Sequence, residues 1–97
     1  MPTQLFHLGR VVMTANLQQK LSDTIPESWE HELKEFIDRH ISGDWEDLDD
    51  HDRQANHRAV KHGGRIFSAY HTSVGTRVYV ITEADRSYTT ALLPEDY

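Results

Sequence analysis

An acidic run between residues 44 and 52 contains the side chains with the most evident chemical potential. Six of its nine residues are acids: Asp44, Glu46, Asp47, Asp49, Asp50 and Asp52. Carboxylates at this density can ligate a cation, imitate the phosphates of a nucleic acid, or cap a helix. A calcium loop needs a glycine at its sixth position, and Asp52 stands there when Asp47 is the first ligand. We therefore expect no metal site in this run.

The acids of this run divide into two groups. The last three stand where a helix is expected to begin, so their carboxylates can accept from free backbone N–H groups and meet the positive end of the helix dipole. The first three have no such local role and are available to solvent or to a partner. Trp45 lies between them, and we expect it either to pin the loop against the domain or to anchor a partner.

The charge of the chain is negative and uneven. The net charge is −6, yet residues 27–52 carry eleven acids and two bases, whereas the rest of the chain carries eight bases and five acids. One side of the fold should therefore be strongly negative. A protein that binds nucleic acid directly usually has a basic face, so this charge favours a protein as the partner.

A second group of residues supports a rival interpretation. A histidine with an acid, an arginine and a hydroxyl on a compact sheet can cleave RNA. The chain offers such a set in His40, Asp85, Arg86 and Thr89. The expected strands also carry basic and aromatic residues typical of single-strand binding, namely Arg65, Arg77, Arg86, Tyr70, Tyr79 and Tyr88. The ordinary alternative is cross-strand pairing and an Asp–Arg bridge that closes a turn.

The elements that must position these residues begin with a strand and helices. Two adjacent valines favour a strand over residues 5–14, in which Gly9 marks a bulge or a close approach. Thr14 can then cap a short helix over residues 15–21. A Thr-x-x-Glu capping box at 24–27 predicts the start of a second helix, which should run to about His40. Acids at the start and bases at the end predict a third helix through Lys61, with Asp49 or Asp50 as its N-cap.

The C-terminal third of the chain has the pattern of strands. We expect strands over residues 65–72, 76–82 and 87–93, separated by short turns. Alternation places Val78 and Val80 on one face of the sheet. The sequence therefore predicts a single small α+β domain over residues 1–97, with an N-terminal strand, two to three helices and a three-stranded antiparallel meander. The first strand should join the meander.

The composition also bears on compartment. The chain has no cysteine, which is neutral about compartment. It has no signal-peptide pattern at its start and no apolar run long enough to cross a membrane. We therefore expect a cytoplasmic protein without a membrane partner.

Five segments together resemble a known family. They read FHLGRVVMT, RHISGDWEDL, GGRIFSAY, GTRVYVITEADRSYTT and LLPEDY. From Phe6 to Tyr97 the chain is similar to short bacterial proteins carried on plasmids and integrative elements, usually called "plasmid-related" and sometimes labelled type I restriction endonuclease subunit M. It departs from them at Glu46, where many have glycine, and at residues 15–16, where Pro-Gly is frequent. A methyltransferase subunit would need a glycine-rich turn after a strand, which is missing here.

The resemblance implies an accessory protein of a mobile genetic element. We expect it to act without catalysis, cofactor or metal, by binding a protein that handles nucleic acid, with anti-defence action or nucleic-acid mimicry as one form. The expected partner-binding residues are Asp44, Trp45, Glu46, Asp47, Asp49 and Asp50. The alternative is a small nuclease-like or RNA-binding module that uses the strand face and the set His40, Asp85, Arg86 and Thr89.

Overall fold

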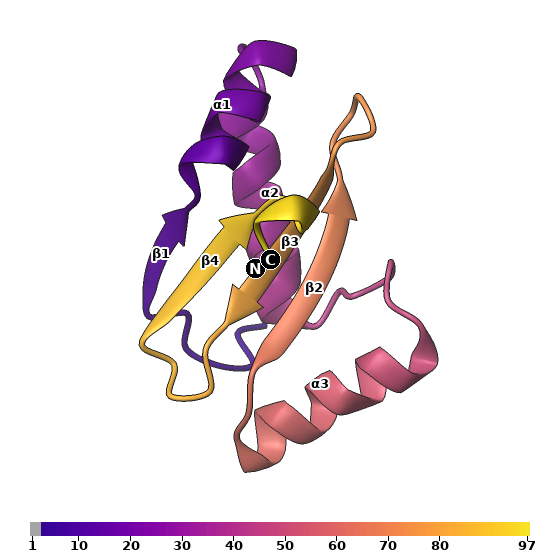
Figure 1. The fold of residues 1–97 in the computed structure, drawn as a ribbon. Coiled ribbons are helices and arrows are strands. Elements are labelled where there is room, and N and C mark those ends of the chain that lie inside the picture. The colour runs from indigo at the N-terminus through magenta and orange to yellow at the C-terminus, as the bar shows by residue number, and fades with distance from the viewer. Residues whose placement is uncertain (1–2) are drawn as a thin grey trace.

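The computed structural model describes residues 3–97, which build an α+β fold around one mixed sheet (Figure 1). The strands are β1 (Arg10–Met13), β2 (Ile66–His71), β3 (Arg77–Thr82) and β4 (Tyr88–Leu92). Their order across the sheet is β1-β4-β3-β2. The strands β2, β3 and β4 form the expected antiparallel meander, and β1 joins it at one edge, parallel to β4. The predicted fold class is therefore confirmed.

The helices are α1 (Ala15–Thr24), α2 (Trp29–Ser42) and α3 (Asp50–His62), and a 3-10 turn, η1 (Pro94–Asp96), follows β4. Figure 1 shows α2 behind the sheet and α3 beside the β2 edge. A first core cluster joins α1, α2 and the sheet, and consists of Leu17, Leu21, Ile25, Phe36, Tyr70, Val78, Val80, Ala91 and Leu93. A second cluster lies where α3 meets β2, and consists of Phe6, Ile41, Trp45, Leu48, Ala59, Ile66 and Ala69.

Two helix starts agree with the expected capping residues. The Thr14 hydroxyl accepts from the N–H of Leu17 at 3.2 Å, and α1 begins at the next residue. The Asp49 carboxylate accepts from the N–H of Asp52 at 2.9 Å, and α3 begins at Asp50. Both caps bond to a group three residues away, which is why the sequence pattern identifies them.

The predicted start of the second helix is wrong. The helix α1 continues to Thr24, whose hydroxyl donates to the carbonyl of Lys20 at 2.7 Å, so it cannot cap α2. The chain then buries Ile25, and α2 begins at Trp29 after Ser28. Tertiary burial of Ile25 thus overrides the local Thr-x-x-Glu pattern, and the first helix is three residues longer than expected.

The first strand is shorter than expected because Gly9 breaks it. Gly9 has φ +64°, and a Cβ there would lie 2.4 Å from the carbonyl oxygens of Arg86 and Ser87. The close approach predicted at this glycine is therefore confirmed. Residues 5–8 leave the sheet, and the N–H of Leu5 donates to the carbonyl of Ile41 at the end of α2.

Candidate functional site

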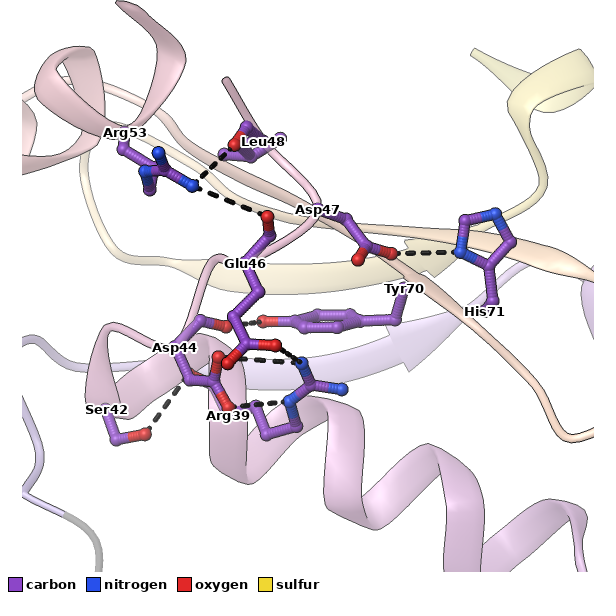
Figure 2. Close-up of polar contacts among 9 residues, drawn as sticks. All are labelled: Arg39, Ser42, Asp44, Glu46, Asp47, Leu48, Arg53, Tyr70 and His71. Atoms are coloured by element: carbon purple, nitrogen blue, oxygen red, sulfur yellow. Dashed lines mark hydrogen bonds and ion pairs between the residues drawn. The ribbon is translucent and has the colours of Figure 1, made fainter. Parts of the chain in front are cut away.

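The acidic loop, residues 44–49, connects α2 to α3 and is held by arginine and tyrosine side chains (Figure 2). Gly43 ends α2 in a left-handed conformation with φ 88°, which only glycine adopts at little cost. The Asp44 carboxylate then accepts from Nε of Arg39 at 2.8 Å, and the Glu46 carboxylate lies 4.0 Å from the same guanidinium. The loop therefore folds back onto the last turns of α2.

Tyr70 also holds this arrangement. Its hydroxyl donates to the carbonyl of Asp44 at 2.9 Å, and its ring faces the guanidinium of Arg39, with 4.6 Å between Cζ and the ring centroid. The same ring stacks on Phe36 at 5.1 Å. Burial raises the pKa of the Tyr70 phenol, so the hydroxyl stays a donor at neutral pH. Tyr70 thus belongs to the core and to the loop, and it is not available to the basic and aromatic set on the strands in which the sequence analysis grouped it.

The other end of the loop is tied to β2 and α3. The Asp47 carboxylate lies 2.9 Å from Nδ1 of His71, at the end of β2. Arg53 of α3 donates to the carbonyl of Leu48 at 2.8 Å and to that of Glu46 at 3.4 Å, and it also pairs with Asp50. Figure 2 shows the contact between Asp47 and His71 and those of Arg53 with the two carbonyls. The loop is therefore held by side chains of α2, β2 and α3 along its length.

Trp45 is a core residue. Its side chain is only 1% exposed, its indole N–H donates to the carbonyl of His40 at 2.9 Å, and its ring meets His57 edge-on at 5.1 Å. It packs in the second core cluster with Leu48 and Ala59. The indole therefore pins the loop against the domain, and it offers no surface to a partner.

The carboxylates that face solvent form a different set from the expected one. The side chains of Glu46 and Asp50 are 80% and 91% exposed. Asp44 and Asp47 are half-buried in their ion pairs. Glu35 lies one helical turn before Arg39, on the same side of α2 as the loop. We call the exposed acids of this region the acidic surface, which we define as Glu35, Glu46, Asp49, Asp50 and Asp52.

The alternative site begins with His40, which lies in a closed hydrogen-bonded chain in the core. Its Nε2 is 2.9 Å from the hydroxyl of Thr82, and its Nδ1 is 2.5 Å from that of Ser68. Thr82 reaches Thr89 at 2.7 Å, and Thr89 donates to the carbonyl of Leu8 at 2.7 Å. The four side chains of this network have no exposed surface; they are His40, Ser68, Thr82 and Thr89.

The direction of this chain fixes the form of the imidazole. Because Thr89 donates to a carbonyl, its oxygen must accept from Thr82, so the Thr82 oxygen must accept from Nε2–H of His40. The Nδ1 atom is then the acceptor for Ser68. Burial lowers the pKa of His40 to about 3, which agrees with this neutral form. His40 and Thr89 thus share one network, but no substrate can reach it.

Arg86 is occupied by backbone carbonyls. Its guanidinium donates to the carbonyls of Gly64 at 2.6 Å and Ala59 at 3.0 Å, and it lies 5.7 Å over the ring of Phe6. These contacts join the β3–β4 turn to the C-terminal end of α3. Asp85 faces solvent and accepts from the N–H of Ser87 at 2.9 Å, and the hydrogen bonds from Ser87 lower the pKa of Asp85. The four residues of the alternative site therefore do not share a cavity.

The helix-free face of the sheet carries an aromatic cluster. Phe67, Tyr79 and Tyr97 have ring centroids between 4.8 and 6.5 Å apart. The guanidinium of Arg77 lies 5.6 Å from the ring of Tyr79, and that of Arg65 lies 5.9 Å from the ring of Tyr97. Sequence reasoning missed Phe67, although it lies two residues after Arg65 in β2 and alternation puts both on one face. No local pattern identified Tyr97, which follows the last strand.

A comparison of the chain with models of protein families, with curated proteins and with solved structures found no match. Over residues 3–97, no helix is long and apolar enough to cross a membrane. Within the same residues, no group of three or more histidine or acidic side chains is placed to hold a metal ion.

Proposed function

We propose that the protein is a non-catalytic accessory protein of a mobile genetic element, and that its acidic surface binds a basic patch on a partner protein in the cytoplasm. The observation that carries this proposal is the exposure of Glu46, in the acidic loop, and of Asp50, at the start of α3, beside a loop that is tied to α2, β2 and α3. The resemblance of the five sequence segments supports the link to mobile elements.

A fixed loop favours binding for an energetic reason. Ordering a mobile loop on association costs roughly 0.5–1.5 kcal/mol for each immobilised side chain. Here the contacts of Arg39, Arg53 and Tyr70 already hold the loop, so this cost is reduced. Exposed charges on such a loop also steer a basic partner toward the site and penalise acidic competitors. A basic patch of this kind is typical of proteins that handle nucleic acid, because it neutralises phosphates.

The placement of the catalytic candidates supports a binding function over an enzymatic one. General acid–base catalysis needs a titrating group within hydrogen-bond reach of the substrate. His40 is buried and neutral, and Arg86 donates to backbone carbonyls on two elements. Neither side chain is placed to act on a bound substrate.

Affinity capture tests the proposal. Tagged protein is incubated with bacterial lysate at low and high salt, with and without nuclease, and the retained proteins are identified. We expect a basic protein to be retained, to stay bound after nuclease treatment, and to be released at high salt. Retention of nucleic acid instead, with no protein that survives the nuclease, would overturn the proposal.

The aromatic cluster on the helix-free face favours one second candidate, the binding of single-stranded nucleic acid. Stacking of a base on an aromatic ring contributes about 1–3 kcal/mol, and flanking arginines attract the phosphates. Tyr79 and Arg77 supply one such pair. Under this candidate, Tyr79→Ala and Arg77→Ala should each weaken the binding of a fluorescent RNA or DNA oligonucleotide. Oligonucleotide binding unchanged by both variants would exclude this face.

A further inference from the structure

The two edge strands of the sheet, β2 and β1, differ in whether their outward backbone groups are covered. At the β2 edge, the side-chain amide of Asn56 in α3 donates to the carbonyl of Phe67 at 2.7 Å and accepts from its N–H at 3.1 Å. This pair of hydrogen bonds imitates the contact that a neighbouring strand would make. Asn56 is buried, and α3 lies beside this edge in Figure 1. The β2 edge is therefore closed to another strand.

The β1 edge is open. The N–H groups of Arg10 and Thr14 donate to carbonyls on the β4 side, of Ser87 and Ala91, both at 3.1 Å. Because backbone groups alternate along a strand, the N–H and C=O groups of Val11 and Met13 point the other way, out of the sheet. In the part of the chain that the structure describes, no strand lies beyond β1. These outward groups can therefore pair with an incoming strand.

Apolar side chains surround this open edge on both faces. Val11 is 47% exposed and Val12 is 38% exposed, and they point to opposite faces because they are adjacent. On the face that α2 covers, Val11 forms one wall of an open groove, and the opposite wall is formed by Trp29, Leu33 and Ile37. The strand is only four residues long, so an incoming strand gains few hydrogen bonds and the groove must supply most of the affinity.

We propose that β1 pairs antiparallel with β1 of a second copy of this chain, across a two-fold axis at Val12. In this register Val11 lies opposite the partner's Met13 and exchanges both outward hydrogen bonds with it. Val12 lies opposite the partner's Val12 on the other face. The central opposed pairs, Val11 with Met13 and Val12 with Val12, are apolar, whereas Arg10 lies opposite the partner's Thr14. The two four-stranded sheets become one continuous sheet.

The groove carries charges of both signs, which favours a second copy of the chain as its occupant. The rim of the groove carries one acid, Glu30, and one base, Lys34. The two-fold axis is perpendicular to the sheet, so the two α2 helices lie on the same side and run antiparallel. This reversal brings Glu30 of one copy toward Lys34 of the other, while Trp29 and Leu33 of both copies cover the paired strands. An acidic or a basic peptide would match only one of these charges.

The dimer is compatible with the acidic surface but does not depend on it. The strands β1 and β2 are the two opposite edges of the sheet, and α3, with the end of the acidic loop, lies at the β2 edge. Pairing through β1 therefore leaves both acidic surfaces open. A dimeric protein would present two of them to a partner, which raises its avidity where both can engage.

Analytical ultracentrifugation of the full chain over a range of concentrations tests the dimer. We expect a concentration-dependent rise from 11.3 kDa to twice that mass. Val12→Lys places a charge at the two-fold axis and should raise the dissociation constant at least about tenfold. Val74→Lys is the matched control, because Val74 is 58% exposed in the β2–β3 turn, and it should dimerise like the wild type. A wild-type protein that stays monomeric at millimolar concentration, or equal dimerisation of both variants, would overturn the proposal.

Hydrogen exchange of single amides tests strand pairing itself. With rising protein concentration, the N–H groups of Val11 and Met13 should gain protection, whereas that of Val12 should be protected throughout because it faces β4. Val11→Pro is a second variant, because it removes only an outward N–H, and it should keep the fold and lose the dimer. Dimerisation with unchanged exchange at Val11 and Met13 would exclude pairing through β1.

Discussion

Nε2 of His40 and the hydroxyl of Thr82 are 2.9 Å apart in the core, in a chain of hydrogen bonds that fixes the imidazole in its neutral form. Because burial lowers the pKa of His40 to about 3, the native state binds fewer protons than the unfolded state between this value and the ordinary histidine pKa of about 6.5. Stability should therefore be fully present above about pH 6.5 and should fall as the pH decreases toward 3.

The expected loss from His40 alone is about 1.4 kcal/mol for each pH unit within this window. Urea unfolding at a series of pH values measures it. His40→Gln should flatten the dependence, whereas His51→Gln, at an exposed histidine of α3, should keep the slope of the wild type. Equal slopes for the wild type and His40→Gln would show that His40 is not the group responsible.

Trp45 should be a stability residue. Trp45→Ala removes a buried indole and its hydrogen bond to the carbonyl of His40, and it should lower the free energy of unfolding by about 3–5 kcal/mol. Trp45→Phe keeps most of the apolar volume but loses the N–H donor, so its cost should be smaller. Chemical denaturation compares the two variants. A Trp45→Ala protein as stable as the wild type would contradict the buried position of this side chain.

Arg86 should stabilise the fold. Its guanidinium links the β3–β4 turn to the C-terminal end of α3 by hydrogen bonds to backbone carbonyls. Arg86→Ala therefore leaves several carbonyls without their charged donor. We expect a loss of about 1.5–3 kcal/mol for the strongest of these bonds. Arg58→Ala, at an exposed arginine of α3, is the control and should change stability little. If Arg86→Ala instead retained full stability and lost RNA binding, the nuclease-like interpretation would regain support.

Gly9 should be intolerant of a side chain. Gly9→Ala places a Cβ 2.4 Å from two backbone oxygens of the β3–β4 turn, so β1 must move away from β4. Gly75→Ala is a matched control with φ +85° and no atom within 4 Å of the new Cβ, so it should cost only the backbone strain of about 1–2 kcal/mol. Thermal unfolding should give a clearly larger decrease for Gly9→Ala. Equal decreases would mean that the close approach at Gly9 does not hold β1.

The features that sequence reasoning identified are those set by near neighbours. The caps Thr14 and Asp49 bond within three residues, and the alternation of Val78 and Val80 needs only one strand. Pairing of the first strand with the meander was also expected, and β1 lies beside β4. The single false helix start, at Thr24, has a correct local pattern, and burial of Ile25 in the tertiary fold decides against it.

The roles of the site residues depend on contacts between distant parts of the chain. Tyr70 fixes Asp44 from 26 residues away, and Arg86 reaches Ala59 from 27 residues away. Neither contact leaves a periodic signal. The burial of Trp45 was one of two open expectations, because the acids beside it favour solvent while the indole favours the core. Within the acidic loop, a carboxylate is held in an ion pair where Arg39 or His71 lies beside it in the fold, and otherwise it faces solvent. The sequence pattern does not reveal these positions.

The most direct test of the acidic surface is the affinity of the captured partner for two double variants with the same charge change. Glu46→Gln with Asp50→Asn neutralises two exposed carboxylates of the acidic surface, and Asp23→Asn with Glu95→Gln neutralises two exposed carboxylates elsewhere. The proposal predicts an affinity lower by roughly tenfold or more for the first pair at low salt, and wild-type affinity for the second. Equal affinities for the two double variants would contradict binding through the acidic surface.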